Sequence, residues 1–145
     1  MSIISKPLAD PVYDPRLLGI FGNHLPTRAR ILNLAGDQRH WFQRHQYEIE
    51  TVATTQDLRL LSLKKESLDG IWSHLTLEHL SIEECHRVLG SFFMGLKPGT
   101  GILFISISEN RHPENAFLSL LRQSGFQLIE KGKSPDSLAF LLRRA

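Results

Sequence analysis

Residues 67–108, SLDGIWSHLTLEHLSIEECHRVLGSFFMGLKPGTGILFISIS, decide the fold. A short apolar strand opens this stretch, a helix over 81–96 follows, and a strongly apolar strand over 102–108 closes it. Ser81 is the predicted N-cap of the helix, and Glu84 three residues later predicts a capping box. A strand, a helix and a strand in this order predict two parallel strands joined by a crossover helix.

Helices and strands alternate along the rest of the chain as well. The pattern predicts helices over 15–25, 38–46 and 113–125, and strands over 30–35, 47–54, 126–132 and 137–144. The last two strands are joined by KSPD, which predicts an antiparallel hairpin. Residues 57–63, DLRLLSL, fit either a short strand or a loop. We therefore predict an α/β fold with a mostly parallel sheet and an antiparallel C-terminal hairpin. One domain spans 1–145, and its residues 1–13 form an extended lead-in.

Composition excludes several classes of function. The 145 residues are 41% apolar and 22% charged, as in an ordinary globular domain. A net charge of +2, with the basic residues spread out, argues against nucleic acid and membrane surfaces as partners. No apolar run reaches the ~20 residues of a membrane helix, and no signal-peptide pattern is present, so we expect a cytoplasmic location. The single cysteine, Cys85, is predicted to be buried in a helix.

From roughly residue 30 to 143, the order and spacing of these motifs resemble the class I S-adenosylmethionine (SAM)-dependent methyltransferases. The likeness is greatest to the small-molecule group called methyltransferase type 11. Asp69 matches the aspartate that opens the family's fourth strand, LEHL at 77–80 follows it, and LKPGTG at 96–101 precedes the fifth strand. The resemblance implies a Rossmann-like sheet, SAM as the cofactor and methyl transfer to a small molecule.

The resemblance also indicates where the cofactor would bind. The family's glycine-rich first motif aligns with 31–39, ILNLAGDQR, in which only Gly36 is a glycine. Ala35 and Asp37 stand where the family has glycines, and Asp37 brings a negative charge near the cofactor's carboxylate. The predicted cofactor-binding residues are Asn33, Ala35, Gly36, Asp37, Asp57, Leu58 and His74.

Two contacts of this predicted site have alternatives. The family's ribose-binding acid aligns with Ala53, whose side chain accepts no hydrogen bond, so Thr54, Thr55 or, in another register, Glu50 would replace it. Asp57 either reaches the adenine amino group, with Leu58 beside the ring, or is a solvated turn residue.

His74 is the candidate catalytic residue, as a general base, if it faces the pocket. The catalytic residues are otherwise unknown. Glu78 and His79 are expected to be surface or capping residues before the helix over 81–96. No metal site is predicted, because the histidine pairs are spaced five residues apart, which does not place two ligands on one helical face.

Only a few residues separate the strand over 47–54 from the segment over 57–63, and a parallel crossover needs about a dozen. We therefore predict that the helix between the family's second and third strands is missing. Its third strand is then missing too, or folds back as a loop or hairpin. This loss should expose Ile49 or Val52. A lid over the site could come from the N-terminal segment, with Tyr13 or Phe21.

Two functional hypotheses follow, and whether the chain is an enzyme stays open. The first is a SAM-dependent methyltransferase-like protein with weakened or lost cofactor binding, acting on an unidentified small molecule. The alternative is a non-catalytic methyltransferase-fold scaffold that acts through a protein partner or as a homodimer. The combined loss of loop glycines, ribose acid and one helix motivates the alternative.

Overall fold

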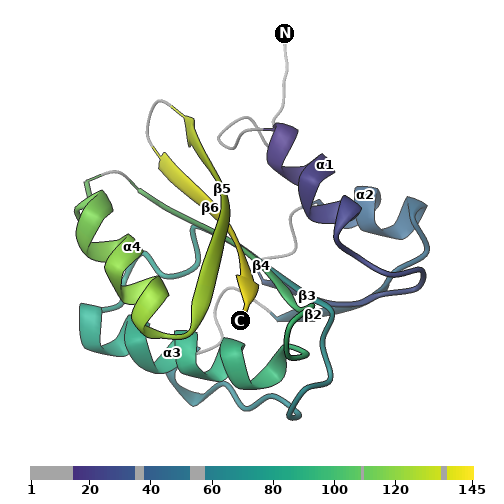
Figure 1. Cartoon of the computed structure of the whole chain (residues 1–145), viewed down its shortest axis with the longest axis horizontal. Helices are drawn as coiled ribbons and strands as arrows, with labels where there is room; N and C mark the ends of the chain where they lie inside the picture. The colour runs from purple at the N-terminus through teal and green to yellow at the C-terminus, as the bar shows by residue number, and fades with distance from the viewer. Residues whose placement is uncertain (1–14, 35–37, 53–57, 109, 135–136) are drawn as a thin grey trace, which may run out of the picture.

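The computed structural model describes residues 15–34, 38–52, 58–108, 110–134 and 137–145. Its elements are α1 (Pro15–Asn23), β1 (Arg30–Leu34), α2 (Arg39–Arg44), β2 (Glu48–Val52), the 3-10 helix η1 (Leu58–Leu60), β3 (Gly70–His74), α3 (Ile82–Gly95), β4 (Ile102–Ser108), α4 (Glu114–Gln123), β5 (Phe126–Ser134) and β6 (Ser137–Arg144) (Figure 1). The predicted helices and strands are confirmed, with ends that differ by a few residues. No helix among the described residues is long and apolar enough to cross a membrane.

The six strands form one sheet in the order β2-β1-β3-β4-β6-β5. The first four strands in this order are parallel, and β6 is antiparallel to both β4 and β5. This arrangement confirms the predicted fold class. The described part of the connection between β2 and β3, residues 58–69, contains no α-helix and no strand, as predicted. Within the described sheet, β2 and β5 are therefore the two outer strands.

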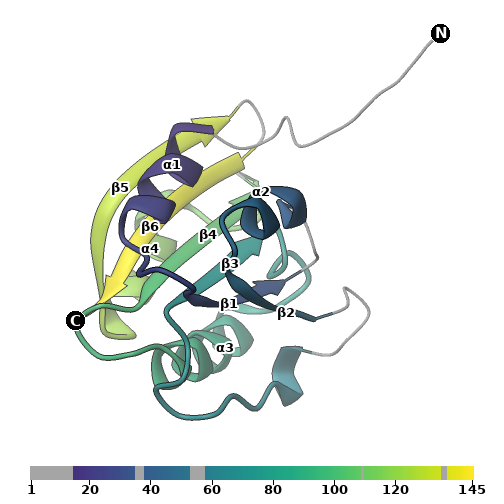
Figure 2. The same cartoon turned by 90° about the vertical axis from the view of Figure 1, so that its right-hand side faces the viewer.

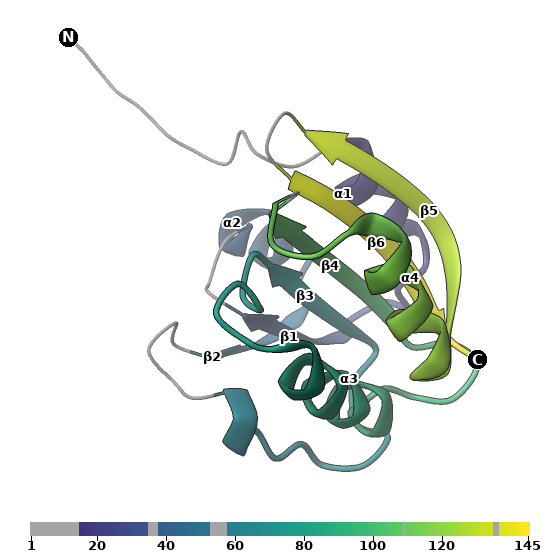
Figure 3. The same ribbon diagram turned by 90° about the vertical axis from the view of Figure 1, so that its left-hand side faces the viewer.

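Helices cover both faces of the sheet. Figure 2 shows α1 and α2 on one face, and Figure 3 shows α3 and α4 on the other. Under α1 and α2 the core is aromatic, and the rings of Trp72 and Phe104 stack with their centroids 3.7 Å apart. Phe21 of α1 packs edge-on against Trp72 and is fully buried, so it is a core residue and not a lid. Tyr13 lies outside the described residues.

The helix α3 is stabilised at its start by the predicted capping box. The hydroxyl of Ser81 accepts a hydrogen bond from the Glu84 amide at 3.2 Å, and the Glu84 carboxylate accepts one from the Ser81 amide at 2.9 Å. The buried side chains of α3 recur at helical spacing and include Cys85, Val88, Leu89 and Phe92. The predicted burial of Cys85 is confirmed.

The loop that follows β2 packs against α3 and the apolar cluster beneath it. Leu58, Leu61 and Leu63 pack against the apolar cluster under α3, to which Val52 also belongs. The prediction that the missing helix exposes Val52 is wrong, because Val52 is buried within that cluster. Ile49 is half-buried against the cluster on the opposite face.

The amino ends of β1 and β3 are joined by one acidic side chain. The buried carboxylate of Asp69 accepts a hydrogen bond from the Arg30 amide at 2.9 Å and lies 3.0 Å from the ammonium of Lys97. Asp69 thus fixes the start of both strands and the turn that follows α3.

Candidate functional site

The candidate site lies at the carboxyl edge of the parallel strands. The chain runs outward from β1 to β2 and then returns to the other side of β1 as β3. Between β1 and β3, therefore, the strand order reverses. In open α/β sheets, ligands bind in the crevice outside the carboxyl ends of the strands at such a switch point.

His74 is the last residue of β3, and its ring is tied to the neighbouring strand. Its Nδ1 lies 2.8 Å from the hydroxyl oxygen of Ser106 in β4, which is fully buried. The same oxygen accepts a hydrogen bond from the Leu75 amide at 3.0 Å. The serine oxygen has two acceptor lone pairs, so it can accept from both the Leu75 amide and an Nδ1–H of His74, which leaves Nε2 unprotonated. In that tautomer Nε2 is a hydrogen-bond acceptor, as a general base requires.

The backbone turns sharply where β3 ends. Leu75 has a φ of 57°, a left-handed conformation that is uncommon for a residue with a branched side chain. Its amide bonds to both the carbonyl and the hydroxyl of Ser106, and the hydroxyls of Ser73 and Thr76 bond to each other. These bonds hold the loop after β3 in one conformation beside His74.

Glu78 has a structural role that sequence reasoning missed. Its carboxylate accepts a hydrogen bond from the backbone amide of Ser108, the last residue of β4, at 2.7 Å. It therefore does not cap α3, since Ser81 and Glu84 do so. Glu78 fixes the loop after β3 to the end of β4, whereas the next residue, His79, is exposed as predicted.

The sequence carried a signal for these contacts in ILFISIS. Ser106 and Ser108 are the only polar residues of β4, and both lie at its carboxyl end. Buried polar side chains are nearly always hydrogen-bonded. Two serines at the carboxyl end of an otherwise apolar parallel strand therefore predict hydrogen bonds at that edge of the sheet.

The structure brings together only some of the predicted cofactor-binding residues. Asn33 is fully buried in β1, and its register partners are Thr51 of β2 and Trp72 of β3. Residues two apart in a strand share a face, so Asn33 and His74 both lie on the face that α1 and α2 cover. Leu58 packs on the opposite face, against the cluster under α3. Ala35, Gly36, Asp37 and Asp57 lie outside the described residues.

The thiol of Cys85 lies near this edge, 4.0 Å from Nε2 of His112. Burial is the main cause that raises the pKa of the Cys85 thiol to about 11. The same cause, reinforced by the neighbouring Arg111, lowers the pKa of His112. At neutral pH both groups are therefore uncharged, and Cys85 is no nucleophile.

Among the described residues, no group of three or more metal-binding side chains is placed to hold an ion.

Comparison with protein-family models and with curated proteins found no match to this sequence. Solved structures do resemble it. A SAM-dependent methyltransferase from Mesorhizobium loti has 16% identity and a TM-score of 0.70, over 87% of this chain and 96% of its own. The 1,6-didemethyltoxoflavin N1-methyltransferase of Burkholderia thailandensis was solved with S-adenosylhomocysteine. It has 15% identity and a TM-score of 0.75, over 98% of this chain and 93% of its own.

A third similar chain comes from the Haloferax volcanii complex that contains the Trm112 methyltransferase activator. It has 12% identity and a TM-score of 0.66, over 90% of this chain and 94% of its own. At such identities the likeness concerns the backbone alone. Together with the strand order and the antiparallel hairpin, it shows that this chain has the fold of the class I SAM-dependent methyltransferases.

Proposed function

We propose that this chain is a methyltransferase-like protein that binds SAM weakly at the carboxyl edge of β1, β2 and β3. The observation that carries the proposal is the position of His74. It ends β3 beside the switch point of the sheet, its ring is oriented by Ser106, and the loop after it is held by Glu78. A preorganised polar group at that edge is what a cofactor or substrate site requires.

The residues at this edge fit the cofactor only in part. Asn33 and His74 share one face of the sheet, and the described chain places them on adjacent strands. Against this, Ala53 directly follows β2 and supplies no side-chain acceptor for the ribose hydroxyls. When bound, SAM would supply an electrophilic methyl group, and His74 could take a proton from the substrate atom that accepts it.

Isothermal titration with S-adenosylhomocysteine and with SAM tests the proposal. We expect saturable but weak binding. Ala53→Asp should tighten it by about tenfold, because a charged hydrogen bond contributes roughly 1.5 kcal/mol or more. Asp37→Asn should tighten SAM binding as well, if this negative charge stands near the cofactor's carboxylate as the family resemblance implies.

Glu48→Gln is the matched control, because Glu48 is exposed at the opposite end of β2. It should leave both affinities unchanged. If neither ligand binds at millimolar concentration, and Ala53→Asp does not restore binding, the proposal is wrong.

A second candidate function is that of a non-catalytic scaffold. One observation that favours it is the outer position of β2 in the described sheet, because an outer strand offers backbone groups to a partner strand. The other is the apolar side chain of Leu60, which is 79% exposed. Light scattering over a hundredfold range of protein concentration tests the homodimer version. A monomer at every concentration contradicts it.

A further inference from the structure

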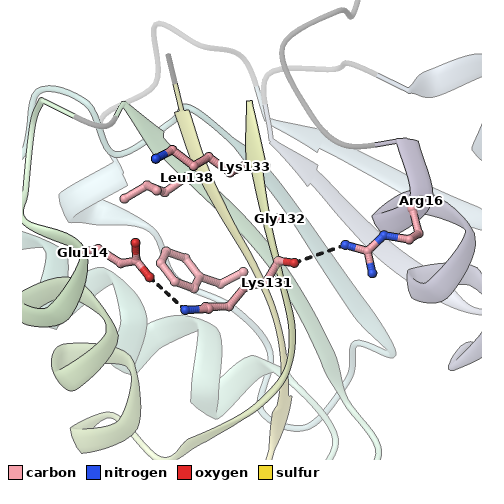
Figure 4. Close-up of a pocket in the computed structure, with 7 residues that line it drawn as sticks. Arg16, Glu114, Lys131, Gly132, Lys133 and Leu138 are labelled. Atoms are coloured by element: carbon pink, nitrogen blue, oxygen red, sulfur yellow. Dashed lines mark hydrogen bonds and ion pairs between the residues drawn. The ribbon is translucent and has the colours of Figure 1, made fainter. Parts of the chain in front are cut away.

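The two outer strands of the described sheet, β2 and β5, differ in how their edges are covered. At β5, the Lys131 carbonyl accepts a hydrogen bond from the guanidinium of Arg16 in α1 at 3.3 Å (Figure 4). Lys131 is also paired with Glu114 at 2.9 Å, and Arg16 with Glu130 at 3.0 Å. In contrast, β2 has a described neighbour only on its β1 side (Figure 2). An outer strand without such cover is open to pairing with another strand.

The backbone groups of β2 that face outward belong to Ile49 and Thr51. The Glu48 amide donates a hydrogen bond to the Ala29 carbonyl at 2.9 Å, toward β1. In a parallel pair, successive residues of a strand turn their amide and carbonyl to opposite sides, so Glu50 also bonds toward β1. The amides and carbonyls of Ile49 and Thr51 therefore point away from the sheet, where they can bond to an added strand.

The side chains of β2 alternate between an acidic row and an apolar one. Glu48 and Glu50 are exposed on the sheet face that carries α3, the same face as the buried Val52. Ile49 faces the opposite way and packs, half-buried, against the aromatic cluster under α1 and α2. A hollow of about 270 Å³ beside the strand is lined by Arg30, Ile31, Glu48, Ile49, Glu50 and Leu68. An added strand would meet carboxylates on one face and the isoleucine on the other.

The two glutamates make this edge acidic on a chain whose net charge is +2. Among the residues that the structure describes, neither glutamate is in an ion pair. Arg30 is the register partner of Glu48 and offsets its charge, because register partners point to the same face. The register partner of Glu50 is the apolar Leu32, so Glu50 is the carboxylate most accessible to a partner's cation.

A second copy of this chain fits the edge poorly. In a dimer with two-fold symmetry, two copies of β2 would pair antiparallel, with both acidic rows on the same face of the joined sheet. Full overlap of the two strands places Glu50 opposite the same glutamate of the other copy, and like charges directly opposite destabilise a strand pair. The occupant that complements this edge is therefore a different chain with basic side chains.

We propose that the outer edge of β2 binds an extended segment of a partner protein in which basic side chains alternate with apolar ones. The segment would add a strand to the sheet through backbone bonds to Ile49 and Thr51. Its basic side chains would contact Glu50 and Glu48, and its apolar side chains would lie beside Ile49. The proposal rests on the second candidate function, a protein that acts through a partner, and names the chemistry of that partner.

The test is an NMR titration of the ¹⁵N-labelled full chain with the blocked peptide Ac-KVKVKV-NH₂ and with its acidic counterpart, Ac-EVEVEV-NH₂. The basic peptide should slow hydrogen exchange at the outward-facing amides of Ile49 and Thr51. The amide of Glu50 already bonds toward β1, so its exchange should be unchanged and serves as an internal control. The acidic peptide should bind at least several-fold more weakly than the basic one.

Substitutions in the lining of the hollow should shift the peptide affinity in opposite directions. Glu50→Gln should weaken binding of the basic peptide roughly two- to fivefold, the range of one exposed ion pair, and Arg30→Gln should strengthen it by a similar factor. Glu50→Lys should reverse the preference, so that the acidic peptide binds more tightly. Glu83→Gln is the matched control and should change nothing, because Glu83 is exposed and absent from this lining. Thermal unfolding verifies that each variant folds.

Equal affinity for the two peptides, or an unchanged preference in Glu50→Lys, overturns the proposal. Without peptide, protection of the Ile49 and Thr51 amides that grows with chain concentration would mean that a second copy occupies the edge. Protection in the dilute chain would mean that the chain itself covers it, and either result also overturns the proposal. The titration contains no cofactor, so its outcome is independent of whether S-adenosylhomocysteine binds. A monomer in light scattering excludes the homodimer and leaves this result intact.

Discussion

The hydroxyl of Ser106 lies 2.8 Å from Nδ1 of His74 and joins the ends of β4 and β3. Ser106 also accepts a hydrogen bond from the Leu75 amide, so one buried side chain orients the imidazole and fixes the turn that follows it. A residue that holds a candidate general base in one tautomer acts through that base and is a positioning residue.

Ser106→Ala should therefore change His74 without unfolding the protein. The Leu75 amide keeps its bond to the Ser106 carbonyl at 3.2 Å, so we expect a loss of about 1 kcal/mol in the free energy of unfolding. That loss corresponds to a decrease of roughly 2–4 °C in the melting temperature. The ¹⁵N shifts of the His74 ring should move toward those of a mixture of tautomers. Ser119→Ala, at an exposed position of α4, is the control, and unchanged ring shifts in Ser106→Ala would contradict this prediction.

Glu78 supports the same loop from its other end. Glu78→Ala removes the acceptor of the Ser108 amide, which should then exchange its hydrogen at least about tenfold faster, because hydrogen bonds to charged groups contribute roughly 1.5–3 kcal/mol. Glu78→Gln keeps a side-chain oxygen and should protect that amide nearly as well as the native residue. Hydrogen exchange measured by NMR distinguishes the two variants. Equal protection in Glu78→Ala and the native chain would show that the bond carries little energy.

Sequence patterns predicted the fold well where burial decides the structure. The apolar run at 102–108 and the capping box at Ser81 and Glu84 became β4 and the start of α3, since both depend on local chemistry. The missing crossover helix was predictable from chain length alone. The burial of Val52 was not, because it depends on the cluster that α3 and the sheet form together, which no local pattern encodes.

The candidate site was predictable only in part. His74 was proposed from its place at the end of a buried strand, and it is the last residue of β3, whereas its role in a site stays a prediction. Its partner Ser106 is 32 residues away, so the contact exists only once β3 and β4 have paired. Phe21 looked available for a lid, but the amphipathic helix α1 turns it toward Trp72.

The buried thiol of Cys85 should make stability depend on pH above neutrality. Burial raises its pKa to about 11, so between pH 9 and 11 the unfolded chain releases this proton while the folded chain keeps it. Stability is then lost as pH rises through this window, by up to about 2–3 kcal/mol. Urea unfolding of the native chain and of Cys85→Ala at several pH values isolates the effect, because other titrating groups are common to both. The stability difference between them should shrink as pH rises, and a constant difference would contradict this prediction.

Asp69 and Lys97 contribute unequally to the ion pair at the amino end of the sheet. Asp69 is buried and also accepts the Arg30 amide, so Asp69→Ala removes a hydrogen bond to a charged group and should cost about 1.5–3 kcal/mol. Lys97 has a side chain that is 45% exposed, so Lys97→Met should cost only about 1 kcal/mol, and less at high salt. Urea unfolding at low and high ionic strength measures both. Lys65→Met, at an exposed position with no role in this contact, should stay within about 0.5 kcal/mol of the native chain. Equal losses in Asp69→Ala and Lys97→Met would mean that the ion pair, rather than the bond to Arg30, holds the two strands together.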